Sequence, residues 1–201
     1  MTIDVPSPID LRLMEDARPW AETALARRPA RTEIFDAFVR EIGRDGVRVL
    51  ELGSGPGFLA DHLLRAWPAL DYVALDFSPA MHELAAERLG ERASRVAFVE
   101  RSFREPAWGQ GLGAFDFVVT NQAVHELRHK DHAAALHAQV RPLLAHGGRY
   151  VVCDHFLGEG GLSNDQLYMT VAGQRDALLQ GGFASVDEVM VQGGLALHRA
   201  Q

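Results

Sequence analysis

A run of closely spaced glycines follows an apolar segment early in the chain. The run consists of Gly53, Ser54, Gly55, Pro56 and Gly57, directly after the apolar residues 47–52. Glycines at such a place let the chain turn tightly and let a ligand approach the backbone. The spacing is G-x-G-x-G, and Phe58 stands where the dinucleotide pattern G-x-G-x-x-G has its third glycine. Taken alone, the run is either a ligand-binding loop or a structural turn, and its spacing counts against a nicotinamide dinucleotide.

A carboxylate follows the next predicted strand. Asp76 ends the strand expected over residues 71–76, 23 positions after Gly53. A carboxylate there can accept hydrogen bonds from both hydroxyls of a ribose. An aspartate after a strand is, taken alone, more often a cap or turn residue. The spacing within one βαβ unit favours ribose recognition.

His125 is the candidate general base. It comes about five residues after a strand expected over residues 115–120. A base is needed only where a substrate must lose a proton, as a reacting hydroxyl must. The alternative is that His125 caps or packs a helical turn. Asp154 and His155, after a strand expected over residues 149–154, are further candidates at the same edge of the sheet.

Four histidines raise the question of a metal: His125, His129, His132 and His137. His125 and His129 could share one helix face, but no carboxylate stands at a spacing that completes a ligand set. The one cysteine, Cys153, falls in a predicted buried strand, so a thiolate zinc site is excluded. We expect no metal.

Strands and helices alternate along the chain. Strands are predicted over residues 47–52, 71–76, 96–100, 115–120, 149–154, 185–191 and 195–199. Helices are predicted over residues 9–27, 32–42, 58–67, 79–90, 130–145 and 165–180. Five βα steps and a final strand pair joined by a glycine turn predict a doubly wound, mostly parallel seven-stranded α/β sheet with an antiparallel last strand. An N-terminal arm over residues 1–30 is expected to precede one domain over residues 31–201.

The composition limits the partners. The formal net charge is −7, which disfavours nucleic acid because phosphate binding needs a basic face. Arg27, Arg28 and Arg31 could still form a local basic patch. No stretch reaches the roughly 20 apolar residues of a transmembrane helix, and the first residues do not resemble a signal peptide. We expect a cytoplasmic protein with no nucleic-acid or membrane partner, and the sequence leaves a homodimer open.

An ordered set of segments resembles the motifs of class I, Rossmann-like S-adenosylmethionine-dependent methyltransferases. The segments are residues 49–57, 73–81, 115–127, 143–154 and 179–183. The resemblance spans about residues 31–201 and implies S-adenosylmethionine as cofactor and S-adenosylhomocysteine as product.

The resemblance also implies roles for single residues. Donor binding would involve Glu51, Gly53, Ser54, Gly55, Gly57, Asp76, Phe77, Met81, Ser102, Phe103, Asn121 and Gln122. Among them, Glu51 would line the methionine half, Asp76 would hold the ribose, and Phe77 and Met81 would pack near the adenine. Ser102 stands where the family often has an aspartate. Asn121 and Gln122 would close over the sulfonium end.

The resemblance does not identify the molecule that accepts the methyl group. The segment after residue 120 lacks the Asn/Asp-Pro-Pro-aromatic run of amino-directed nucleic-acid methyltransferases, which, with the acidic charge, favours a small-molecule or protein acceptor. Of these two, we expect a small molecule methylated on oxygen or nitrogen. Residues 156–170 are either a flexible lid or an ordinary connection, and Trp20, Arg27 and Arg31 either reach the cofactor or cover the sheet. The alternatives are a non-catalytic cofactor-binding protein of the same fold and an NAD-dependent oxidoreductase.

Overall fold

The structure, a computed structural model, describes residues 2–24 and 31–201. The chain forms two compact units, one of residues 8–108 and one of residues 109–201 together with the N-terminal segment through Ser7. Arg27 and Arg28 of the predicted basic patch lie outside the described residues. The predicted domain boundary at residue 30 stays a prediction.

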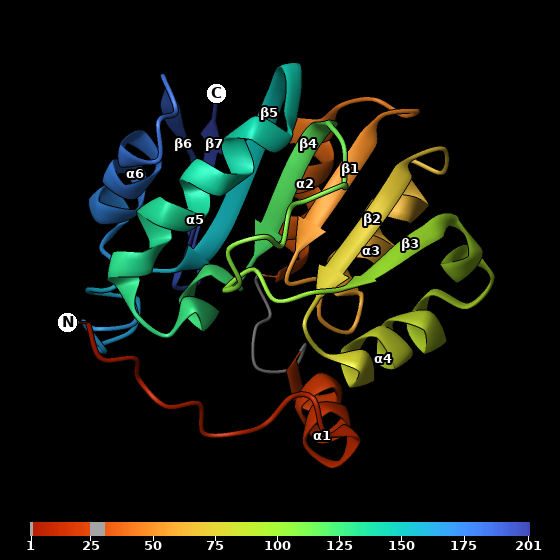
Figure 1. The fold of residues 1–201 in the computed structure, drawn as a ribbon, viewed down its shortest axis with the longest axis horizontal. Coiled ribbons are helices and arrows are strands. Elements are labelled where there is room, and N and C mark those ends of the chain that lie inside the picture. The colour runs from red at the N-terminus through yellow and green to blue at the C-terminus, as the bar shows by residue number, and fades with distance from the viewer. Residues whose placement is uncertain (1, 25–30) are drawn as a thin grey trace. The chain divides into compact units, whose positions relative to one another are not determined.

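Three parallel strands organise the unit of residues 8–108 (Figure 1). They are β1 (Arg48–Leu52), β2 (Asp71–Asp76) and β3 (Val96–Glu100). The helices are α1 (Met14–Ala24), α2 (Arg31–Ile42), α3 (Phe58–Ala66), α4 (Pro79–Leu89) and the 3-10 helix η1 (Gly90–Arg95). β1 and β2 are buried almost throughout, as strands covered on both faces must be. Their register pairs Leu52 with Leu75, so the glycine run begins beside Asp76.

The unit that contains residues 109–201 has four strands. They are β4 (Phe115–Asn121), β5 (Leu144–His155), β6 (Val186–Gln192) and β7 (Leu195–Ala200). The helices are η2 (Val124–Leu127), η3 (Lys130–His132), α5 (Ala133–Val140), η4 (Arg141–Leu143) and α6 (Val171–Gln180). β4 and β5 are parallel, whereas β7 is antiparallel to both β5 and β6. Gly193 and Gly194 both have positive φ and form the turn between β6 and β7, as glycine allows.

The strand order is β3-β2-β1-β4-β5-β7-β6. This confirms the predicted doubly wound, mostly parallel seven-stranded sheet with an antiparallel last strand. In such sheets the residues that follow the parallel strands are the ones that bind ligands.

The predicted helix over residues 130–145 is wrong in its extent. It is divided into η3, α5 and η4, and it ends at Leu143. Pro142 has no N–H group and its ring obstructs the preceding turn, so α5 stops at Val140. Gly147 and Gly148, expected to precede the strand, lie within β5, where the pairing with β4 shifts register.

The predicted helix over residues 165–180 begins later, at Val171. The side chain of Thr170 caps it by accepting a hydrogen bond from the N–H of Gly173 at 3.0 Å. The side chain of Asn164 accepts hydrogen bonds from the N–H groups of Gln166 and Leu167. Because that side chain holds the backbone in a turn, the helix cannot start at residue 165.

The N-terminal helix also begins later than predicted, at Met14 instead of Ile9. The Asp10 carboxylate accepts hydrogen bonds from the backbone and side chain of Arg12, which turns the chain before the helix. Residues 25–27 of the prediction lie outside the described part of the chain.

His137 on α5 makes the fold sensitive to acid. Its side chain is buried, and burial lowers the pKa of His137 to about 3, against about 6.5 in the unfolded chain. Below pH 6.5, His137 therefore binds a proton in the unfolded chain but stays neutral in the folded chain. The free energy of unfolding that this residue supports above pH 6.5 is lost as the pH falls. We expect this group to lower the free energy of unfolding by about 2 kcal/mol between pH 7 and pH 5.

Urea unfolding of the wild type and a His137→Leu variant at both pH values measures this contribution. The variant should lose less stability on acidification than the wild type. The exposed His146, changed to leucine, serves as the control and should leave the acid loss unchanged. Equal losses in the wild type and in His137→Leu would show that another group is responsible.

Candidate functional site

The glycine run forms a loop whose amides all donate inside the chain. The N–H groups of Gly53 and Ser54 donate to the Leu75 carbonyl oxygen at 2.8 and 3.1 Å, and that of Gly57 donates to the Ser54 carbonyl oxygen at 3.2 Å. The N–H of Gly55 donates to Oδ2 of Asp76 at 2.8 Å. A pyrophosphate site needs such amides turned toward the ligand. The use of these four amides within the chain counts against binding of a pyrophosphate by the glycine run itself.

Asp76 links this loop to the start of α4. Its Oδ2 accepts the hydrogen bond from Gly55, and its Oδ1 accepts one from the N–H of Ser78 at 3.0 Å. Ser78 then caps α4, as predicted, because its hydroxyl oxygen accepts from the N–H of Met81. The carboxylate thus shapes both segments, which is the turn role that the sequence offered as the alternative for Asp76. Its predicted contact with a ribose stays a prediction.

Gly57 and Phe58 complete the loop. Gly57 has a φ of 75°, and a Cβ there would approach Cβ of Ala85 on α4 to 3.0 Å. The Arg88 guanidinium lies 3.9 Å from the centre of the Phe58 ring, and its Nε donates to the Pro56 carbonyl oxygen. The last glycine therefore serves the close approach of α4, while Phe58 is held by a cation–π contact.

Several atoms around the loop suit a bound molecule. The Ser54 hydroxyl is buried and has no hydrogen-bond partner among the described residues. A Cβ added to Gly55 would meet no described atom within 4 Å, so the space beside its backbone is open. The Phe77 ring, directly after Asp76, is 39% exposed, which is unusual for a large apolar side chain. These features fit a ligand with a polar part and a flat apolar part.

Glu51 is a buried acid beside the loop. The Tyr72 hydroxyl donates to its Oε2 at 2.8 Å. Burial raises the pKa of Glu51 to about 8, the hydrogen bond from Tyr72 opposes this rise, and the charge of Asp76 adds to it. Glu51 is therefore mostly a neutral acid at pH 7.

The remaining residues predicted in this unit have mixed surroundings. Met81 is 2% exposed and packs in a core of α1 and α4 with Ala17 and Ala21, against which Trp20 also packs. Arg31 lies over the Phe58 ring at 5.4 Å. Trp20 and Arg31 thus have packing roles in the unit.

Ser102 and Phe103, which follow β3, are both half-buried. The Ser102 hydroxyl oxygen accepts a hydrogen bond from the N–H of Arg104 at 3.3 Å. The adenine contact predicted for these two residues stays a prediction.

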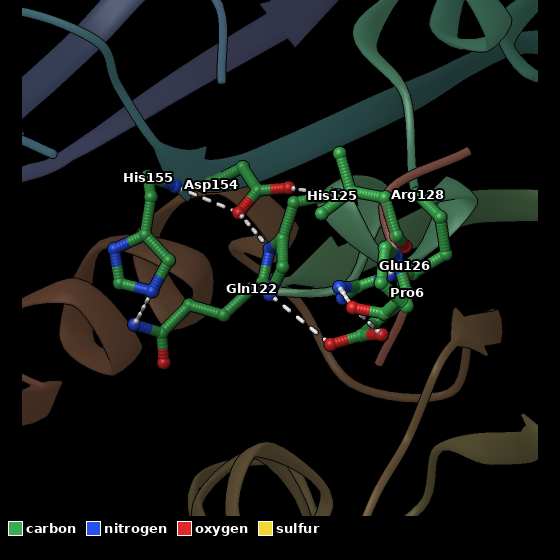
Figure 2. Close-up of polar contacts among 8 residues, drawn as sticks. Pro6, Gln122, His125, Glu126, Arg128, Asp154 and His155 are labelled. Atoms are coloured by element: carbon green, nitrogen blue, oxygen red, sulfur yellow. Dashed lines mark hydrogen bonds and ion pairs between the residues drawn. The ribbon is translucent and has the colours of Figure 1, made fainter. Parts of the chain in front are cut away.

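In the other unit, polar side chains gather after β4 and β5 (Figure 2). Oδ1 of Asn121, at the end of β4, is buried and has no hydrogen-bond partner among the described residues. Gln122 has a φ of 57°, a conformation that costs energy for any residue other than glycine. The backbone N–H of Gln122 donates to the carbonyl oxygen of Cys153. The side-chain Nε2 of Gln122 lies 3.4 Å from Nε2 of His155. Cys153 is buried, as predicted.

His125 is held between two carboxylates. Its Nδ1 lies 2.7 Å from Oδ1 of Asp154, and its backbone N–H donates to Oδ2 of Asp154 at 2.8 Å. Its Nε2 lies 3.3 Å from Oε1 of Glu126. The sequence suggested His125 and Asp154 separately but did not link them. The available signal was that His125 follows β4 closely and Asp154 lies near the end of β5, and these two strands prove to be parallel neighbours.

These contacts set the charge of His125. Burial lowers its pKa, but the attraction and hydrogen bonding of Asp154, with those of Glu126, outweigh burial and raise the pKa of His125 to about 10. Burial would raise the pKa of Asp154 and of Glu126, but His125 outweighs it together with a second group in each case and lowers both pKa values. The second group is His155 for Asp154 and Arg128 for Glu126. At neutral pH the site holds an imidazolium between two carboxylates.

Residues 156–170 fold back on themselves. Phe156 bridges to Met169 and Leu157 bridges to Leu162, and the N–H of Leu157 donates to the Met169 carbonyl oxygen at 2.7 Å. The Tyr168 ring lies 5.6 Å from that of His125 and 5.9 Å from that of His155. The segment therefore brings an aromatic side chain to the two histidines.

Three of the four histidines considered for a metal site lie apart from His125; they are His129, His132 and His137. η2 is a short 3-10 helix and His129 is extended, so the predicted shared helix face of His125 and His129 is wrong. His132 pairs with Asp4 at 2.9 Å, and His137 is buried on α5. Among residues 2–24 and 31–201, no group of three or more histidine, cysteine or acidic side chains could hold a metal ion.

Comparison with known proteins agrees with this geometry. A family model described as a methyltransferase domain matches residues 49–148. A malonyl–acyl-carrier-protein O-methyltransferase of Legionella pneumophila is 36% identical over 78 residues, which are 39% of this chain and 26% of that protein. A trans-aconitate 2-methyltransferase of Mycobacterium tuberculosis is 44% identical over 59 residues, which are 29% of this chain and 23% of that protein. The chain thus spans less than a third of the length of these relatives.

Solved structures share the fold at low identity. An O-methyltransferase family protein from Burkholderia thailandensis matches 92% of this chain and 59% of its own, with a TM-score of 0.71 and 21% identity. A glycopeptide N-methyltransferase matches 85% of this chain and 89% of its own, with a TM-score of 0.67 and 16% identity. The family predicted from the sequence motifs is confirmed: the chain carries a methyltransferase domain over residues 49–148, and its fold is that of the Rossmann-like methyltransferases.

Proposed function

We propose that the chain transfers a methyl group from S-adenosylmethionine to an oxygen or nitrogen atom of a small molecule. The observation that carries the proposal is the methyltransferase domain over residues 49–148, which includes the glycine loop and Asp76. S-adenosylmethionine supplies an electrophilic methyl group on a sulfonium. The protein's contribution to such a displacement is mainly alignment of the two reactants.

The donor site in this proposal uses the residues that the motifs suggest. They are Glu51, Gly53, Ser54, Gly55, Gly57, Asp76, Phe77, Met81, Ser102, Phe103, Asn121 and Gln122. The open space beside Gly55, the buried Ser54 hydroxyl and the exposed Phe77 ring support this assignment. The inward-turned loop amides favour it over NAD.

Binding and turnover test the proposal together. S-adenosylhomocysteine and NAD are titrated against the protein, and methyl transfer is then followed over a panel of acceptors. Because the relatives named above act on malonyl–acyl-carrier protein and trans-aconitate, the panel includes carrier-linked and free carboxylic acids, alcohols and amines. Binding of NAD but not of S-adenosylhomocysteine would overturn the proposal, and donor binding without turnover would favour a non-catalytic protein.

His125 is the proposed general base. It takes the proton of an acceptor hydroxyl at Nε2, where the hydroxyl replaces the contact with Oε1 of Glu126, while Asp154 at Nδ1 fixes the ring and stabilises its positive charge. With a pKa of about 10, the ring must first lose its own Nε2 proton. The proposal therefore predicts that kcat/KM rises with pH up to about the pKa of His125.

Glu51 provides a test of how the donor is held. We expect binding of S-adenosylhomocysteine to release close to one proton at pH 7, because Glu51 has a pKa of about 8 and the ligand's ammonium group favours the carboxylate. Calorimetry in buffers of different ionisation enthalpy counts the released protons. Glu51→Gln should abolish the release, and Glu83→Gln, an exposed control, should not. A binding enthalpy independent of buffer would place the ligand's ammonium group away from Glu51.

The remaining features of the proposal concern location and partners. We place the protein in the cytoplasm, without a nucleic-acid partner, and we leave a homodimer open. The net charge of −7 supports a small-molecule acceptor over nucleic acid. Within residues 2–24 and 31–201, no helix is long and apolar enough to cross a membrane.

A further inference from the structure

Arg128 joins the N-terminal segment to the His125 site. Its three guanidinium nitrogens each donate to a different acceptor: Nε to the Val5 carbonyl oxygen at 2.9 Å, Nη2 to the Pro6 carbonyl oxygen at 2.8 Å, and Nη1 to Oε2 of Glu126 at 3.2 Å. The N–H of Val5 donates back to the Arg128 carbonyl oxygen at 2.9 Å. Figure 2 shows the fork between Pro6 and Glu126. Two segments more than 120 residues apart are thus fastened at one side chain.

The same contacts continue to His125. Oε2 of Glu126 binds Arg128, while Oε1 of the same carboxylate lies 3.3 Å from Nε2 of His125. The Arg128 side chain is only 10% exposed, and its backbone has a φ of 67°, which a residue other than glycine adopts only where its surroundings require it. The N–H of Arg128 also donates to the His125 carbonyl oxygen at 3.0 Å. Arg128 is therefore fixed from both its backbone and its side chain.

We propose that the segment Asp4–Pro6 is a strap that holds the Arg128 fork, and that Arg128 is a positioning residue which keeps Glu126 against Nε2 of His125. Only arginine offers three donor nitrogens in one plane, so a lysine would keep the charge but could not serve all three acceptors. A hydrogen bond of 2.9 Å between Nε2 of His132 and Oδ1 of Asp4 fastens the strap at a second point. The inference deepens the proposed function, because it concerns the nitrogen at which His125 would accept a proton.

Other groups also face His125. Asp154 binds Nδ1, and the rings of His155 and Tyr168 lie 5.4 and 5.6 Å from the imidazole. None of these three contacts passes through the strap. Loosening the strap should therefore remove the effect of Glu126 on the pKa of His125 and leave the effect of Asp154 in place.

NMR titration of the His125 ring in the full chain tests this. Deletion of residues 2–7 and the Arg128→Lys variant both keep a positive charge at position 128 but weaken the fork. Both should lower the pKa of His125, as Glu126→Gln does by removing the carboxylate. In the Glu126→Gln background, deletion of the strap should cause no further shift, because the two changes act on one contact. Ile3→Ala, at an 82% exposed position in the same segment, is the control and should have no effect.

The outcomes separate the two proposals. An unchanged pKa of His125 in both the deletion and Arg128→Lys, or an undiminished shift in the Glu126→Gln background, would overturn the strap. If the deletion failed to fold, Arg128→Lys alone would decide. Methyl transfer is measured separately: the expected pKa shifts without any turnover would support the strap and count against the proposed function.

Discussion

Replacing Asp76 with alanine is expected to weaken S-adenosylhomocysteine binding by roughly 10- to 150-fold, the effect of losing about 1.5–3 kcal/mol of charge-assisted hydrogen bonding. Two causes contribute. The carboxylate is the proposed acceptor for the ribose hydroxyls, and it also holds the N–H groups of Gly55 and Ser78. Calorimetry measures the total effect. Asp71→Ala, at the exposed start of the same strand, is the matched control and should bind like the wild type.

A ligand without ribose hydroxyls separates the two causes. In the wild type, a 2′,3′-dideoxy analogue of S-adenosylhomocysteine should bind more weakly than S-adenosylhomocysteine itself. In Asp76→Ala the two ligands should bind almost equally, because the carboxylate that distinguishes them is gone. If the analogue loses as much affinity in the variant as in the wild type, Asp76 acts only by shaping the loop.

Replacing His125 with asparagine is expected to lower kcat/KM for a hydroxyl acceptor by about 10²- to 10⁴-fold, the range for loss of a general base. Asparagine keeps an N–H group that can donate to Asp154, so the buried carboxylate retains a partner. S-adenosylhomocysteine affinity should stay unchanged. The exposed His146, changed to asparagine, is the control and should leave kcat/KM unchanged.

The pH profile gives the base its signature. With a pKa of about 10 for His125, kcat/KM of the wild type should rise about tenfold per pH unit from neutral pH and level off near pH 10. His125→Asn should lose this dependence. A flat profile in the wild type, together with full activity in His125→Asn, would assign the histidine a structural role.

Local signals predicted much of the fold. The strands over residues 71–76 and 96–100 were predicted with the bounds that the structure has, because each is a short apolar run between clear turn residues. Ser78 followed by Pro79 predicted the start of α4, because serine caps helices and proline suits the first helical position. The start of β5 could not be predicted, because two successive glycines, Gly147 and Gly148, are typical of a helix end. In the structure they lie inside β5, which pairs with β4 on both sides of them.

The sites were predictable as parts but not as networks. The motifs pointed to Asp76 and His125, yet nothing in the sequence showed that Asp76 would anchor Gly55 or that Asp154 would hold His125. The Arg128 fork was missed altogether, because two of its three acceptors are backbone carbonyl groups near the N-terminus that any residue type could supply. Such contacts depend on the folded path of the chain and leave no mark on residue type.

The inward amides of the glycine loop affect the thermodynamics of ligand exchange. A loop whose N–H groups already have acceptors is ordered by folding, so a ligand need not pay for its conformational entropy on arrival. Under the proposed function, S-adenosylmethionine and its product S-adenosylhomocysteine differ by a single methyl group, and both bind the same ordered glycine loop. Turnover can then proceed by exchange of one for the other without rebuilding the loop in each cycle.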